Sequence, residues 1–151
     1  MTNLKSVDEI LDFAIGKEEE AAAFYTDLAG RVDKPWMKKV FEEFANEEKG
    51  HKAKLQAVKR GKQLVPAAKK VLDLKLADYL IDGEITADID YQEALIVAMK
   101  AEKSAYKLYT NLADTTDDEN LRNTFLALAQ DEAKHKLRFE IEYDDRMLEG
   151  N

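Results

Sequence analysis

The chain contains two copies of one segment, and this duplication constrains the fold more than any other feature. When the sequence is shifted by 84 positions, residues 9–52 align without gaps to residues 93–136, with 15 identities in 44 positions. A period this long exceeds the roughly 20–50 residues of solenoid repeats and suits a duplicated helical hairpin. We therefore expect a bundle with approximate twofold symmetry, in which a site on the axis is built from paired residues.

Apolar residues recur at steps of three and four along four segments, which predicts four helices. Gly30 and Gly61 are candidate ends for the first two helices. Pro35 suits the first turn of the second helix because its missing N–H costs nothing there. Thr116 and Glu119 form a candidate capping box for the fourth helix. The expected helices span approximately residues 7–30, 34–60, 90–113 and 117–148.

The lengths of the connections predict how these helices are arranged. The first and second helices are joined by a few residues, as are the third and fourth, so each pair forms an antiparallel hairpin. A much longer connection separates the second helix from the third, and we expect a short packed helix near 73–81 within it. Short, long and short connections predict an all-α antiparallel four-helix bundle with one crossover. We expect residues 1–151 to form a single domain.

Composition narrows the class of protein. The chain has 31 acidic residues against 23 Lys and Arg, a net charge of -8, which disfavours nucleic acid as a partner. Cysteine is absent, which excludes disulfides, thiolate metal sites and cysteine nucleophiles. No apolar run approaches the roughly 18 residues of a membrane span, and the N-terminus lacks the apolar core of a signal peptide. We therefore expect a cytoplasmic protein without a membrane partner.

The chain has two histidines, and both have glutamates at the same spacings. Each histidine follows one glutamate by three residues and another by 33 residues. Residues three apart share a helix face, so Glu48 projects with His51 and Glu132 with His135. The four glutamates each lie 15 residues from the centre of their hairpin turn, near residue 33 or 117, so the side chains should meet at one level of the bundle. The two sets are Glu18, Glu48 and His51, and Glu102, Glu132 and His135.

These six positions fall on the apolar stripes that face the core. A buried charge without a partner costs several kcal/mol, and no Lys or Arg lies on these stripes at the same level. Two divalent metal ions would neutralise four carboxylates, and carboxylate with imidazole but no thiolate suits iron or manganese. The sequence therefore predicts a site for two metal ions in the core.

The sequence resembles the rubrerythrin-type proteins of the ferritin-like superfamily over nearly its whole length. The segments that carry the resemblance are residues 18–25, 47–51, 102–109 and 131–135. The resemblance implies a di-iron centre bridged by Glu48 and Glu132, with manganese as an alternative in one or both positions. It implies terminal ligation by Glu18 and Glu102, with His51 and His135 each completing one metal.

The chain departs from the family pattern at three points. Rubrerythrin-type peroxidases usually carry an extra Glu where this chain has Ala105, so we expect a more symmetric site without that exchangeable ligand. The family often has a rubredoxin domain with four Cys, which is missing here, so electrons should come from a separate rubredoxin-like protein. Lys49 stands where haem-binding bacterioferritins have Met, so haem is not expected.

Four further residues are candidates for positioning the ligands. Glu47 and Asp131 each precede a glutamate that the resemblance implies is a bridging ligand. The resemblance implies that each accepts a hydrogen bond from a ligating histidine on another helix, and an exposed charge is the alternative. Tyr25 and Tyr109 face the core two turns from a predicted ligand, and we expect them to pack there. A hydrogen bond to the site, or a redox role, is the alternative for these two tyrosines.

By resemblance, the leading function is a peroxide reductase that converts hydrogen peroxide to water in defence against oxidative stress. A ferroxidase or iron-handling protein of the ferritin type needs the same ligands. A third alternative is a non-catalytic helical module stabilised by metal. A fourth is a monooxygenase that oxidises an organic substrate, although the sequence gives no sign of a pocket for one. The sequence leaves open whether hydrogen peroxide or O₂ is the physiological oxidant, and we expect a homodimer.

Overall fold

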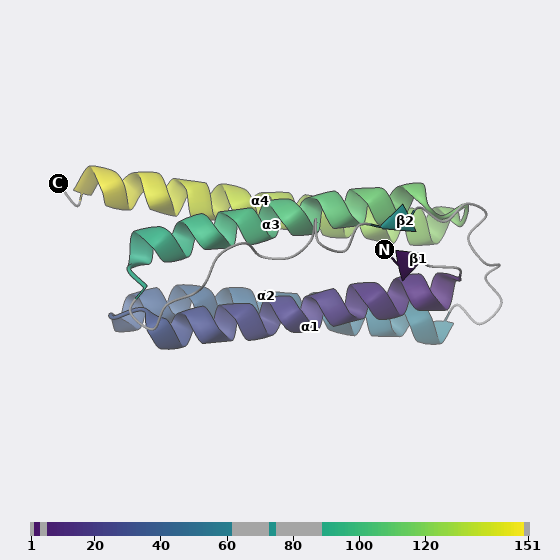
Figure 1. Cartoon of the computed structure of the whole chain (residues 1–151), viewed down its shortest axis with the longest axis horizontal. Helices are drawn as coiled ribbons and strands as arrows, with labels where there is room; N and C mark the ends of the chain where they lie inside the picture. The colour runs from purple at the N-terminus through teal and green to yellow at the C-terminus, as the bar shows by residue number, and fades with distance from the viewer. Residues whose placement is uncertain (1, 4–5, 62–72, 75–88, 150–151) are drawn as a thin grey trace.

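The computed structural model describes residues 2–3, 6–61, 73–74 and 89–149, and four long helices dominate this part of the chain. The helices are α1 (Val7–Arg31), α2 (Pro35–Gly61), α3 (Tyr91–Asp114) and α4 (Glu119–Glu149). α1 and α2 form one hairpin, α3 and α4 form the other, and the two hairpins lie lengthwise against each other (Figure 1). α2 ends and α3 begins at opposite ends of the bundle (Figure 1). The predicted all-α four-helix bundle with one crossover is confirmed. None of the described helices combines the length and the hydropathy needed to cross a membrane.

Two short strands pair at one end of the bundle. β1 (Thr2–Asn3) and β2 (Asp73–Leu74) are antiparallel, with Thr2 opposite Leu74. The predicted short helix near 73–81 is wrong at its first two residues, and residues 75–81 lie outside the described part of the chain. A short apolar run does not by itself distinguish a helix from a strand, which is why the prediction failed there.

Side-chain caps explain where two of the helices begin. Ser6 Oγ accepts a hydrogen bond from the backbone N–H of Glu9 at 3.1 Å before α1. Asp90 Oδ1 accepts one from the N–H of Glu93 at 2.7 Å before α3. Each bond satisfies one of the N–H groups that the first turn of a helix leaves without a partner. α2 begins at Pro35, so the proline lies in the first turn as predicted, one residue after the expected start.

Two predicted helix boundaries need correction. α4 is capped by Asp118, whose Oδ1 accepts the N–H of Leu121 at 2.7 Å, and not by a Thr116–Glu119 box. Thr116 Oγ1 instead accepts the N–H of Asp118 at 3.1 Å, which shapes the turn before the helix. Gly30 does not end α1, because the helix continues to Arg31.

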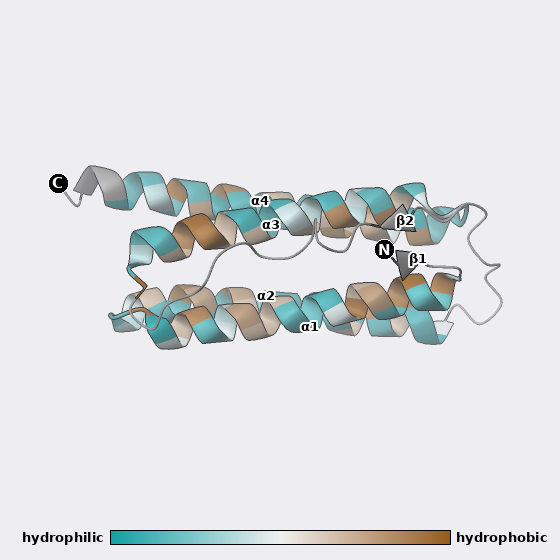
Figure 2. Cartoon of the chain, in the orientation of Figure 1, coloured by the Kyte–Doolittle hydropathy of each residue, from teal (hydrophilic) through white to brown (hydrophobic). Residues whose placement is uncertain are grey.

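A polar layer divides the apolar core into two clusters. On α1, residues 7–15 supply the first cluster and residues 24–29 supply the second, with Glu18 between them. On the other three helices, the predicted ligands likewise lie between residues of the first cluster and residues of the second. Figure 2 shows the hydrophilic colours midway along α1. Phe125 in the first cluster and Phe41 in the second occupy equivalent positions of the repeat and are both completely buried. Burial of each such ring contributes about 1.5–3 kcal/mol, so the two clusters hold the polar layer in place from both sides.

Candidate metal centre

The polar layer brings together all six residues that the sequence predicts as ligands. The four glutamates are at most 2% exposed and the two histidines at most 9%. They form two groups, and within each group one donor atom from every residue lies within 4.8 Å of the others. Glu48 and Glu132 belong to both groups. The first group adds Glu18 and His51, and the second adds Glu102 and His135.

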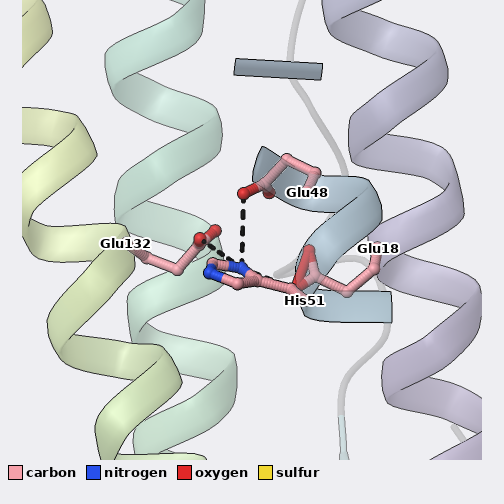
Figure 3. Close-up of side chains that lie close together, drawn as sticks. All are labelled: Glu18, Glu48, His51 and Glu132. Carbon is pink, nitrogen blue, oxygen red and sulfur yellow. Dashed lines mark hydrogen bonds and ion pairs between the residues drawn. The ribbon is translucent and has the colours of Figure 1, made fainter. Parts of the chain in front are cut away.

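In the first group, His51 lies among three carboxylates (Figure 3). Its Nδ1 lies 3.0 Å from Glu18 Oε2, 3.1 Å from Glu132 Oε1 and 3.4 Å from Glu48 Oε1. These residues come from α1, α2 and α4, so three helices meet at one imidazole nitrogen.

The second group repeats this arrangement in the other half of the bundle. His135 Nδ1 lies 3.5 Å from a carboxylate oxygen of each of Glu48, Glu102 and Glu132. The rings of His51 and His135 are 5.8 Å apart and only 7° from parallel. The twofold symmetry predicted from the repeat is therefore present in the site itself.

Several polar atoms of the layer have no hydrogen-bond partner among the described residues. They are Glu48 Oε1, Glu102 Oε2, both carboxylate oxygens of Glu132 and His135 Nδ1. A buried polar atom without a hydrogen-bond partner lowers the stability of the fold by about 1–3 kcal/mol. Several such atoms in one layer therefore indicate a site for a bound ligand. The donors are carboxylate oxygens and imidazole nitrogens, which suit iron and manganese. The residues present therefore fit two metal ions.

The electrostatics of the metal-free layer support the same conclusion. Burial, together with the charges of neighbouring carboxylates, raises the pKa of Glu48 and of Glu132 well above the usual range. Burial alone would lower the pKa of His51, but its hydrogen bond to Glu18 and the nearby carboxylates outweigh burial and raise that pKa to about 9. Without metal, the layer therefore retains protons that bound cations would displace.

The outer nitrogens of both histidines contact carboxylates across the bundle. His51 Nε2 lies 3.3 Å from Asp131 Oδ2, and His135 Nε2 lies 3.0 Å from Glu47 Oε2. Each contact joins α2 to α4, so each carboxylate meets the histidine of the other hairpin. Two roles were open for Glu47 and Asp131: orienting a histidine, or simply carrying an exposed charge. The contacts with the histidines favour the first role. Such contacts fix the ring orientation and direct the opposite nitrogen into the site.

The two tyrosines pack in the core and also bond to the site. Tyr109 Oη donates a hydrogen bond to Glu18 Oε2 at 2.7 Å, and Tyr25 Oη donates one to Glu102 Oε1. Burial, and then the negative charge of the carboxylates, raises the pKa of both phenols well above the usual value. Both therefore stay protonated and act as donors. Packing in the core was the expected role of these tyrosines and a hydrogen bond was the alternative, and the structure shows both.

Arg138 lies near the site and was not predicted from the sequence. Its Nη1 lies 3.2 Å from Glu47 Oε2, and its guanidinium lies 4.3 Å from the centre of the Phe44 ring. Phe44 in turn meets the ring of His135 edge-on at 5.0 Å. Arg138 therefore contacts both Glu47 and Phe44, the two side chains that pack against His135 from outside the site. Its position three residues after His135, on the same helix face, is the sequence signal that could have revealed it.

The fold and this layer define a class of protein: four-helix bundles that hold a paired carboxylate and histidine site in their core. The sequence model of the rubrerythrin family matches residues 9–86 and 93–151. The chain therefore belongs to the rubrerythrin family.

Solved structures give the same result for the fold. A hypothetical protein from Pyrococcus furiosus is 26% identical, with a TM-score of 0.70 over 97% of this chain and 92% of that chain. A candidate ferritin-like diiron-carboxylate protein from Thermotoga maritima is 22% identical, with a TM-score of 0.67 over 95% of this chain and 97% of that chain. No curated protein sequence matches this chain.

Proposed function

We propose that this protein is a non-haem di-iron peroxide reductase. The observation that carries the proposal is that Glu48 and Glu132 belong to both groups of donors and hold three of the five buried atoms without partners. Carboxylates shared in this way favour two neighbouring ions over two separate sites. Membership of the rubrerythrin family, and the description of the Thermotoga relative as diiron-carboxylate, support iron as the metal.

The assignment of ligands follows from the two groups. Glu48 and Glu132 would bridge, Glu18 and His51 would complete one ion, and Glu102 and His135 would complete the other. Four carboxylates and two divalent ions leave the site neutral, and manganese in one or both positions satisfies the same donors. When bound, two ferrous ions would supply the two electrons that reduce hydrogen peroxide to two molecules of water.

The side chains of the protein position the ligands and keep water away. Tyr25 and Tyr109 hold the terminal carboxylates by their phenol hydrogens, while Glu47 and Asp131 hold the histidines. The apolar clusters on both sides of the layer limit the access of bulk water. Because several contacts fix each ligand side chain, the ligands need to move little during the reaction, and the energetic cost of rearranging them is small.

The supply of electrons requires a partner, which we propose to be a separate rubredoxin-like donor. The chain has no cysteine with which to build an iron–sulfur centre of its own. We also propose that the protein acts in the cytoplasm, since a chain without disulfides suits a reducing compartment. We further propose that it forms a homodimer.

The test is peroxide turnover by the iron-loaded protein, prepared without oxygen. We expect two ferrous ions to be oxidised for each hydrogen peroxide consumed. Glu18→Gln and Glu132→Gln should lose this activity, whereas Glu19→Gln should keep it, because the Glu19 side chain is 56% exposed and lies next to Lys52. Retained activity in the first two variants would show that the proposed site is wrong. Faster oxidation by O₂ than by peroxide, with release of ferric iron, would favour a ferroxidase.

A further inference from the structure

A cavity of about 220 Å³ lies between α1 and α3 and reaches the candidate metal centre. Its inner end is formed by Glu18 and Glu48, which are 2% and 1% exposed. Lys17 and Glu20 lie at its outer rim, where the Glu20 side chain is 67% exposed. The wall between the rim and the inner end consists of Ala21, Ala101, Ser104, Ala105, Leu108 and Tyr109.

Small side chains leave this space empty. Ala21 on α1 and Ala105 on α3 occupy equivalent positions of the repeat and both line the cavity, as do Ala101 and Ser104 on α3. A cavity of about 150 Å³ with apolar walls can remain dry and bind benzene. The present cavity is larger than that, and its wall is mainly apolar, so it has room for a hydrocarbon group of this size.

The inner end of the cavity has a different chemistry. Glu18 and Glu48 line it, and both belong to the groups of donors that make up the candidate metal centre. An apolar wall that leads to this centre suits a ligand with an apolar body and a polar end. Small-molecule sites commonly combine apolar walls with a few polar groups in this way.

We propose that this cavity binds the hydrocarbon group of an organic hydroperoxide, ROOH, with the peroxide end at the carboxylate layer. The proposal rests on the proposed function and extends its substrate class beyond hydrogen peroxide. The O–O bond breaks, one oxygen stays on the product alcohol and the other leaves as water. Two ferrous ions held by the six ligands would supply the two electrons, and solvent would supply the two protons.

The kinetic test compares cumene hydroperoxide with hydrogen peroxide on the iron-loaded protein. Ala105→Leu fills the cavity, and Ala101→Leu is a second variant in case the first does not fold. We expect kcat/KM for cumene hydroperoxide to fall about tenfold or more, since a change of one or a few methylenes in an apolar pocket has effects of this size. Hydrogen peroxide turnover should stay within about twofold. The matched control is Ala57→Leu, at an exposed position of α2, which should change neither rate.

The second test needs no turnover. The product alcohol, 2-phenyl-2-propanol, should bind the metal-free full-length chain and shift the NMR signals of the Ala21, Ala101 and Ala105 methyl groups. Ala105→Leu should abolish these shifts at the remaining alanines, and Ala57→Leu should preserve them. Absence of binding to the wild-type chain would overturn the proposal, as would an equal loss of both peroxide activities in Ala105→Leu. A protein that reduces hydrogen peroxide but not cumene hydroperoxide would overturn it while leaving the proposed function intact.

Discussion

Tyr109 Oη donates a 2.7 Å hydrogen bond to Glu18 Oε2, although the two residues are 91 positions apart in the sequence. Tyr25 donates the equivalent bond to Glu102. Each hairpin therefore holds a carboxylate of the other, and the duplication appears in the structure as an exchange of hydrogen bonds between α1 and α3. This exchange joins the two halves of the bundle at the level of the site.

Removal of this bond should weaken metal binding without unfolding the protein. Tyr109→Phe keeps the buried ring but leaves Glu18 without its phenol donor. Loss of a group that supports a ligand typically lowers metal affinity about 10–100-fold, and we expect an effect of that size. Competition with a chelator measures it. Tyr106→Phe is the control, since Tyr106 is 40% exposed on the same helix, and equal affinities for the two variants would contradict the role of Tyr109.

The carboxylates beyond the histidines should have a comparable effect. Asp131→Asn replaces the charged neighbour of His51 Nε2 with a neutral amide, so the imidazole loses the charge that orients it. We again expect an affinity about 10–100-fold lower, from iron titration of the purified variant. The exposed Asp144 on the same helix provides the control Asp144→Asn. An unchanged affinity in Asp131→Asn would mean that the contact with His51 is incidental.

Most of the site could be predicted from spacing along the helices. Glu48 and His51 lie three residues apart on one helix, and the repeat carries that pair to the other hairpin, so helical geometry alone brings the donors to one level. The partners of Tyr25 and Tyr109 could not be predicted in this way. Each tyrosine lies two turns from one glutamate on its own helix but bonds to the glutamate of another helix. That choice depends on how α1 and α3 pack, which residue spacing does not determine.

The cavity and the helix ends were beyond sequence analysis for related reasons. The walls of the cavity include Ala21 on α1 and Ala105 on α3, and an alanine in a sequence does not reveal which residues of another helix lie near it. Thr116 and Asp118 both match the preference for helix caps, so the start of α4 depends on which side chain reaches a free N–H. In the structure, Asp118 does so.

The metal-free protein should lose stability as pH rises, and Glu48→Gln should reduce that loss. Burial raises the folded-state pKa of Glu48 above its ordinary value of 4.5, so the folded chain retains a proton that the unfolded chain releases. The free energy of unfolding therefore falls as the pH rises from about 4.5, the pKa in the unfolded chain, to the raised pKa of the folded chain. Glutamine is neutral throughout, so the Tm advantage of Glu48→Gln should grow as the pH rises above about 4.5. Thermal unfolding with a chelator present tests this, and a constant or shrinking advantage would contradict it.

The apolar clusters should make large contributions to stability. Phe41 is completely buried in the cluster that also contains Phe44 and Phe139. Phe41→Ala should lower the free energy of unfolding by about 3–5 kcal/mol, since it removes a ring and leaves a cavity. Phe125→Ala, the equivalent change in the other cluster, should cost a similar amount. Urea unfolding measures both, and a loss below about 1 kcal/mol in either variant would show that the cluster concerned is poorly packed.

Six side chains of the polar layer should hold a pair of iron ions. Elemental analysis of protein reconstituted with ferrous iron in the absence of oxygen measures this. We expect about two irons per chain in the wild type, and a loss of both ions in Glu132→Gln because Glu132 belongs to both groups of donors. Wild-type protein that retains no metal after reconstitution, or a Glu132→Gln variant that still holds two irons, would show that these side chains do not form a di-iron site.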